Sequence, residues 1–179
     1  MRKLKMSELN RLSVQEFKSA RKLPVVIVLD NIRSQNNIGS IFRTADAFRC
    51  QAIYLCGITA TPPHREIQKT ALGATDSVNW KYYPDTLQTI QDLKIANYKI
   101  YAVEQTDKSI PIDAFDPDIR SGIAVIFGNE VSGIDDQVLM QVDGCIEIPQ
   151  SGTKHSLNIS IAAAIVLWDL YQKGKKLFI

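Results

Sequence analysis

Two segments near the C-terminal end combine small, amide and acidic residues at places where helices are expected to begin. The first, 126–134, begins at the end of an apolar run and contains Gly128, Asn129 and Glu130. The second, 148–158, places Ser156 and Asn158 at the start of a long apolar stretch. Backbone N–H groups at a helix N-terminus bind anions and polar ligand groups. Together the two segments predict one pocket that holds a small ligand.

A third segment, at 37–49, places an amide and an arginine on a predicted amphipathic helix. Arg43 falls off the apolar stripe of this helix, whereas Asn37 and Gly39 lie near its positive end. One interpretation has Asn37 and Arg43 bind a phosphate or a reacting hydroxyl. The other has Arg43 as a surface side chain paired with Asp46, a contact of little energetic weight. The motif alone leaves both interpretations open.

The elements that must position these residues alternate between short apolar strands and amphipathic helices. Strands are expected at 25–29, 52–56, 78–82, 99–103, 123–127 and 145–148, and helices at 7–19, 37–49, 64–72, 85–96, 134–142 and 156–172. Asn36 or Asn37 is expected to cap the second helix, and Ser156 the last. The alternation is typical of an α/β fold with a parallel sheet flanked by helices, in which ligands bind at the carboxyl ends of the strands.

Length and charge indicate one domain with basic ends. The 179 residues predict a single domain, 1–179, whose residues 1–23 form a basic N-terminal arm or helix. Residues 1–22 carry a net charge of +5 and the lysines at 173–176 add +3, so that 23–172 carries −6 within the total of +2. Basic ends on an acidic body suit a polyanion such as RNA, although charged ends also serve solubility alone.

Several classes of protein are disfavoured. Three cysteines without a C-x-x-C pair, and two histidines without ligand partners at suitable spacing, argue against a disulfide framework and a metal site. The N-terminal sequence is not a signal peptide and no apolar stretch reaches membrane-spanning length, so we expect a cytoplasmic protein with no membrane partner. Ile134 stands where a P-loop requires lysine, which disfavours a nucleotide triphosphatase. The absence of G-x-G-x-x-G argues against a classical dinucleotide site, and the absence of G-x-S-x-G argues against a serine hydrolase.

Taken together, the segments 37–43, 126–130 and 148–158 closely resemble the three signature motifs of the SpoU (TrmH-like) RNA 2′-O-ribose methyltransferases of the SPOUT superfamily. Their order and spacing match, and the resemblance covers about residues 24–172. It implies a parallel α/β sheet with a deep C-terminal trefoil knot, a homodimer, and S-adenosylmethionine as the cofactor. It further implies methylation of a ribose 2′-hydroxyl in structured RNA, and we expect tRNA rather than rRNA.

The resemblance also implies roles for individual residues. Arg43 matches the motif arginine that acts on the 2′-hydroxyl. The other residues implied at the catalytic site are polar: Asn37, Glu130, Ser156 and Asn158. The cofactor-binding residues it implies are Ala102, Val103, Glu104, Gly128, Ile148, Ser156 and Leu157. Since an arginine side chain is effectively always protonated, we expect Arg43 to orient the RNA phosphate and stabilise a developing alkoxide, not to act as a base.

Two alternatives stay open: an RNA-binding module that has lost catalysis, and a SPOUT base methyltransferase. The complete set of polar motif residues argues against the first alternative. The presence of both Asn37 and Arg43 in the first motif favours a ribose target over a base. The segment 61–74 is expected to lie near the site and to face the substrate.

Overall fold

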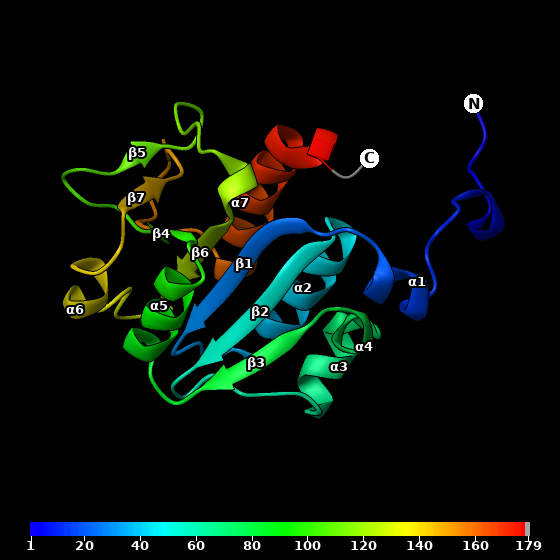
Figure 1. Ribbon diagram of the computed structural model, residues 1–179, viewed down its shortest axis with the longest axis horizontal. Helices are drawn as coiled ribbons and strands as arrows, with labels where there is room; N and C mark the ends of the chain where they lie inside the picture. Colours follow the sequence, from blue (N-terminus) through cyan, green and yellow to red (C-terminus); the bar gives the residue numbers. More distant parts are fainter. Residues whose placement is uncertain (178–179) are drawn as a thin grey trace.

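The computed structural model describes residues 1–177, which build one seven-stranded sheet (Figure 1). All its strand pairs are parallel, and the strand order is β3-β2-β1-β6-β4-β7-β5. The strands are β1 (Leu23–Asp30), β2 (Cys50–Cys56), β3 (Trp80–Tyr83), β4 (Lys99–Val103), β5 (Ile110–Pro111), β6 (Ile123–Phe127) and β7 (Gly144–Glu147). The predicted parallel α/β sheet is confirmed, with one two-residue strand, β5, that is too short to show a sequence pattern.

Helices connect the strands. They are α1 (Val14–Ser19), α2 (Gln35–Ala47), α3 (Arg65–Ala71), α4 (Ala74–Ser77), α5 (Thr86–Ile95), α6 (Asp136–Leu139) and α7 (Ile159–Gly174), with short 3-10 turns η1 (Met6–Glu8), η2 (Ile119–Ser121) and η3 (Lys175–Leu177). The helix expected at 134–142 is one short turn, and the one expected at 7–19 begins only at Val14, where Ser13 and Glu16 form a capping box. Within residues 1–177, no helix is long and apolar enough to cross a membrane.

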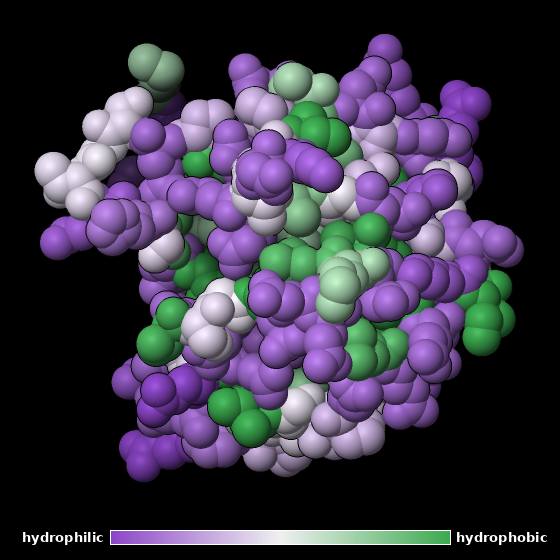
Figure 2. Space-filling model, turned by 90° about the vertical axis from the view of Figure 1, so that its left-hand side faces the viewer, coloured by the Kyte–Doolittle hydropathy of each residue, from purple (hydrophilic) through white to green (hydrophobic). Residues whose placement is uncertain are grey.

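Strand β1 is apolar from Leu23 to Leu29, and both of its faces are covered. Val25, Ile27 and Leu29 pack in the core that includes α2 and α7, whereas Val26 and Val28 pack in the core under α5 and α6. Burial on both faces is expected for strands at the centre of a parallel sheet. The side of the molecule that carries β5, β7 and α6, at left in Figure 1, is mostly hydrophilic, with apolar patches near the middle (Figure 2).

Two helix caps differ from the sequence expectation. Helix α2 is capped by Ser34, whose hydroxyl accepts a hydrogen bond from the Asn37 N–H (3.3 Å), because the helix begins at Gln35. Helix α7 is capped by Asn158, whose side-chain oxygen accepts from the Ser160 N–H (2.9 Å). Ser156 therefore lies two residues before the cap, in the loop between β7 and α7.

The closing helix α7 is fixed against the segment that joins β5 to β6. The Lys173 ammonium donates to the carbonyls of Ile112 and Phe115 and forms an ion pair with Asp169 (2.6 Å). The chain therefore leaves β7, passes the 148–158 loop, and returns to pack α7 against α2 and β1. The trefoil threading of this segment stays a prediction of the family resemblance.

Gly39 allows α2 and α3 to approach closely. A Cβ atom at position 39 would lie 2.1 Å from Thr70 Oγ1 and 2.3 Å from the Ile67 carbonyl oxygen. The same Thr70 hydroxyl donates to the Asn36 carbonyl (3.0 Å), which ties the two helices together. The glycine of the first motif thus serves helix packing.

We predict that Gly39→Ala lowers the free energy of unfolding by about 1–3 kcal/mol, because the added methyl group overlaps the backbone of α3. Gly152→Ala is the matched control: nothing lies within 4 Å of its added Cβ, and a change of less than about 1 kcal/mol is expected. Denaturant unfolding of both variants measures the difference. Equal stability of Gly39→Ala and the natural protein would contradict the packing role.

Candidate active site

A cavity of about 640 Å³ opens at the carboxyl ends of β4, β6 and β7. Three chain segments form it: the end of β4, the turn after β6, and the loop between β7 and α7. The lining residues are Val103, Glu104, Gln105, Phe127, Gly128, Asn129, Glu130, Val131, Ser132, Gly133, Ile134, Ile146, Glu147, Ile148, Gln150, His155, Ser156, Leu157, Asn158, Ile159 and Ala162. The structure therefore joins the second and third motifs in one pocket.

Most of the residues expected at a cofactor site line this cavity. They are Val103, Glu104, Gly128, Ile148, Ser156 and Leu157. Ala102 is the exception: it is fully buried in β4, paired with Ile126 and Cys145 in the core under α5. The alternation of side chains along a strand directs it away from the cavity that Val103 reaches.

Gly128 shapes the cavity wall because the chain turns back on itself after β6. A Cβ at this position would lie 2.5 Å from the Gly133 carbonyl carbon and 2.6 Å from the Ile134 nitrogen. Asn129 and Gly133 close the turn with two backbone hydrogen bonds, at 3.1 and 3.0 Å. The second motif is thus a tight turn and not the start of a helix, which is why α6 begins only at Asp136.

Glu130 connects the second motif to the first. Its carboxylate accepts hydrogen bonds from the backbone N–H groups of Arg33 and Ser34, each at 3.1 Å. Beside it, the Asn129 amide donates to the Asn31 carbonyl (2.7 Å). The carboxylate lies at the start of α2, where the helix dipole favours negative charge, and it holds the backbone just before the first motif.

Asn37 links all three motifs. Its side-chain oxygen accepts a hydrogen bond from the Asn158 amide (3.2 Å), and its side chain lies near enough to the Glu130 carboxylate to help lower the pKa of that carboxyl. Three of the polar residues expected at the catalytic site, one from each motif, therefore lie side by side at the rim of the cavity. Ser156, the fourth, lines the same cavity two residues before Asn158.

The environment of Glu130 favours its charged form. Partial burial raises the pKa of this carboxyl, but hydrogen bonds from the backbone of Arg33, Glu130 and Ser34 and from the Asn37 side chain outweigh burial, and the pKa lies below its ordinary 4.5. Because the folded-state pKa is lowered, these contacts stabilise the fold above pH 4.5, and the contribution is lost as the pH falls through the folded-state pKa.

Gln105 is a site residue that the sequence did not reveal. Its side-chain amide donates to the His155 carbonyl (3.2 Å) and so joins the end of β4 to the third motif. Glu147, at the end of β7, was also missed; it lines the cavity while accepting a hydrogen bond from the Ser109 hydroxyl (3.0 Å). The one sequence feature that could have identified these two residues is their position, since both lie at the carboxyl ends of strands.

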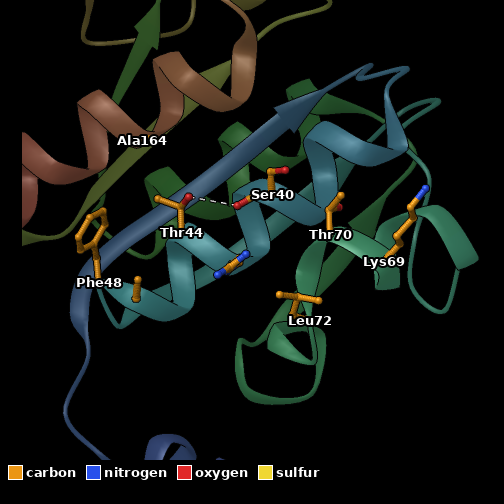
Figure 3. Close-up of a pocket in the computed structure, with 9 residues that line it drawn as sticks. Ser40, Thr44, Phe48, Lys69, Thr70, Leu72 and Ala164 are labelled. Carbon is orange, nitrogen blue, oxygen red and sulfur yellow. Dashed lines mark hydrogen bonds between the residues drawn. The ribbon is translucent and has the colours of Figure 1, made fainter. Parts of the chain in front are cut away.

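Arg43 lies outside this cavity, in a second groove of about 540 Å³ between α2, α3 and α7 (Figure 3). Ser40 and Thr44 line the groove from α2, Lys69 and Thr70 from α3, and Ala164 from α7. The segment expected to face the substrate, 61–74, therefore reaches Arg43 through α3.

Arg43 is exposed, and the structure does not support the pairing with Asp46 that the sequence left open. Asp46 accepts a hydrogen bond from the Ser77 hydroxyl, and no ion pair joins it to Arg43 within residues 1–177. Arg43 lies six residues beyond Asn37, about 9 Å along the helix axis. The guanidinium therefore remains available to a partner from outside the chain.

The cavity combines apolar walls with carboxylates. Val103, Ile134, Ile148 and Leu157 supply apolar surface, and Glu104, Glu130 and Glu147 supply negative charge. In the part of the chain that the structure describes, no group of three His, Cys, Asp or Glu side chains is placed to hold a metal ion. The arrangement suits an organic ligand with a flat apolar part and positive charge.

Known proteins are similar to this chain in sequence and in fold. The chain matches the SpoU rRNA Methylase family over residues 24–168. It is 28% identical to a tRNA (guanosine(18)-2′-O)-methyltransferase of Thermus thermophilus over 170 residues, which is 95% of this chain and 86% of the relative.

Two solved structures have the same architecture. A TrmH/SpoU tRNA modifying enzyme of A. aeolicus superimposes with a TM-score of 0.80 at 21% identity, over 92% of this chain and 82% of the other. An AdoMet-bound rRNA methyltransferase of Sinorhizobium meliloti gives a TM-score of 0.76 at 24% identity, over 86% of this chain and 60% of the other. With its three motifs joined around one cavity, the chain belongs to the SpoU rRNA methylase family.

Proposed function

We propose that this protein transfers a methyl group from S-adenosylmethionine to a ribose 2′-hydroxyl in structured RNA. The observation that carries the proposal is that hydrogen bonds bring the three motifs together beside the cavity: Asn158 donates to Asn37, and Glu130 holds the backbone at the start of α2, the helix that carries Asn37. The named activities of the Thermus relative and of the Sinorhizobium structure support it. The polar set is complete, which favours an active enzyme over a binding module that has lost catalysis.

The residues of the cavity fit this cofactor. About 640 Å³ lies within the ordinary range for small-molecule sites, about 300–1,000 Å³. Val103, Ile148 and Leu157 would pack against the adenine, and backbone groups of the turn at 128–134 would hold its polar edge. When bound, S-adenosylmethionine would supply an electrophilic methyl carbon: the ribose oxygen would bond to it, the hydroxyl proton would pass to solvent water, and the carbon–sulfur electron pair would stay on sulfur.

The motif residues position the RNA hydroxyl in this proposal. The amides of Asn37 and Asn158 lie together at the cavity rim, where they would hold the ribose against the methyl carbon. In-line alignment of two reacting groups is the main requirement of such a transfer. The Arg43 guanidinium would bind the RNA phosphate and stabilise negative charge that develops on the ribose oxygen.

A homodimer would bring Arg43 to a cavity. Within one chain, Arg43 lines a groove separate from the cavity, so we propose that it serves the partner subunit's site. The exposed apolar side chains beside that groove support α2 and α7 as the interface: Ile161 is 52% exposed, and Trp168, 51% exposed, stacks with Tyr171 and lies 5.8 Å from the Phe48 ring. Large exposed apolar surface commonly marks a protein contact.

The location of the basic arm favours a large, folded RNA. The arm precedes Leu23 at the amino end of β1, whereas the cavity follows the carboxyl ends of the strands; the end of α7 at Gly174 lies beside Leu23, on the side of the arm (Figure 1). Strand β1 alone spans about 26 Å, so a single nucleotide cannot contact both regions. We propose tRNA over rRNA, with support from the similarity to the Thermus tRNA enzyme, and a cytoplasmic location.

Methyl transfer tests the function directly. The protein is incubated with methyl-labelled S-adenosylmethionine and either total tRNA or total rRNA, and the labelled nucleoside is identified after digestion. We expect a 2′-O-methylated nucleoside from tRNA. A label on a base would indicate a base methyltransferase, and cofactor binding without transfer to any RNA would indicate the inactive RNA-binding module.

We predict that Arg43→Lys lowers turnover about 100-fold, because lysine lacks the planar fork that binds a phosphate and an oxyanion together. Affinity for S-adenosylmethionine and stability should not change, since Arg43 lines no part of its own chain's cavity and lysine keeps the positive charge at the proposed interface. Arg120→Lys, at an exposed residue of η2, is the control. Near-normal turnover of a folded, cofactor-binding Arg43→Lys variant would overturn the role.

A further inference from the structure

The charges that line the cavity have one sign. Among residues 1–177, the lining includes the carboxylates of Glu104, Glu130 and Glu147, and it includes no lysine or arginine. They come from different elements, at the ends of β4 and β7 and in the turn after β6. Part of the net negative charge of residues 23–172 is thus gathered at the lining of this cavity.

Each of these carboxylates is held in place by the protein. Glu104 accepts hydrogen bonds from the N–H groups of Ile134 (3.3 Å) and Gln105 (3.0 Å). Gly133 adopts φ +69°, and a Cβ there would lie 2.6 Å from Glu104 Oε2, so the carboxylate fits against this turn. Glu147 is held by the Ser109 hydroxyl and Glu130 by α2. In the part of the chain described, none of the three forms an ion pair.

We infer that Glu104 and Glu147 make this pocket select the charged cofactor over its own product. The inference rests on the proposed function. S-adenosylmethionine carries one more positive charge than S-adenosylhomocysteine, on a sulfonium that becomes a neutral thioether when the methyl group leaves. Carboxylates that attract the sulfonium have no such partner after transfer, so the pocket binds the cofactor more tightly than the product.

The dimensions of the pocket make this attraction effective without a specific ion pair. The sulfur joins the adenosyl and methionine halves of the ligand, so it would lie near the middle of the site. A sphere of 640 Å³ has a radius of about 5 Å, shorter than the screening length of about 8 Å at physiological ionic strength. A unit charge about 6 Å away changes affinity about three- to tenfold at an effective dielectric constant of about 40–80.

Calorimetry with three ligands separates charge from shape. The ligands are S-adenosylmethionine, S-adenosylhomocysteine and sinefungin, an analogue with a protonated amine near the sulfonium position. We expect Glu104→Gln and Glu147→Gln each to weaken both cationic ligands about three- to tenfold and to leave S-adenosylhomocysteine within about twofold. In each variant the side-chain carbonyl still accepts one hydrogen bond. Higher salt should weaken only the cationic ligands.

Glu66→Gln, on α3 outside the cavity lining, is the matched control and should change no affinity. Thermal unfolding confirms that each variant is folded.

An equal loss of affinity for all three ligands would show that the carboxylates only hold the turn. No loss of affinity for any ligand would show that they have no role. Either result overturns the inference. Methyl transfer by a wild-type protein with equal affinity for cofactor and product overturns the inference alone, whereas wild-type protein that binds none of the ligands overturns the proposed function with it.

Discussion

The site depends on one carboxylate that holds two distant parts of the chain together. Glu130 follows a central strand, yet it binds the backbone of Arg33 and Ser34 at the start of α2, nearly a hundred residues earlier in the sequence. The two N–H groups it satisfies precede the helix that carries both Asn37 and Arg43. The position of the first motif is therefore set by the second.

Further hydrogen bonds extend this contact around the cavity. Asn37 joins the first motif to Asn158 in the third, Gln105 joins the third motif to the end of β4, and Glu104 joins that end back to the second motif. Each loop of the site is thus held by another, which pre-organises the pocket. Rigid placement of the reacting groups is what a transfer between cofactor and RNA requires.

The sequence predicted the parallel sheet because central strands are long apolar runs, and it predicted the motif residues because they follow strand ends. It did not predict that Ser34 and Asn158 cap their helices, since Asn36, Asn37 and Ser156 are equally good caps by type. Gly39 and Gln105 act through contacts with residues far along the chain, which spacing does not reveal. The separation of Arg43 from the cavity likewise follows from how α2 packs.

The most direct test of the central contact is an NMR titration of the Arg33 and Ser34 amides in the folded protein. Both amide signals should shift together as Glu130 is protonated, with a midpoint below pH 4.5, because the net effect of their hydrogen bonds is to lower the pKa of its carboxyl. In Glu130→Gln the shift should disappear. A midpoint at or above pH 4.5, or an unchanged titration in the variant, would contradict the contact on which the site depends.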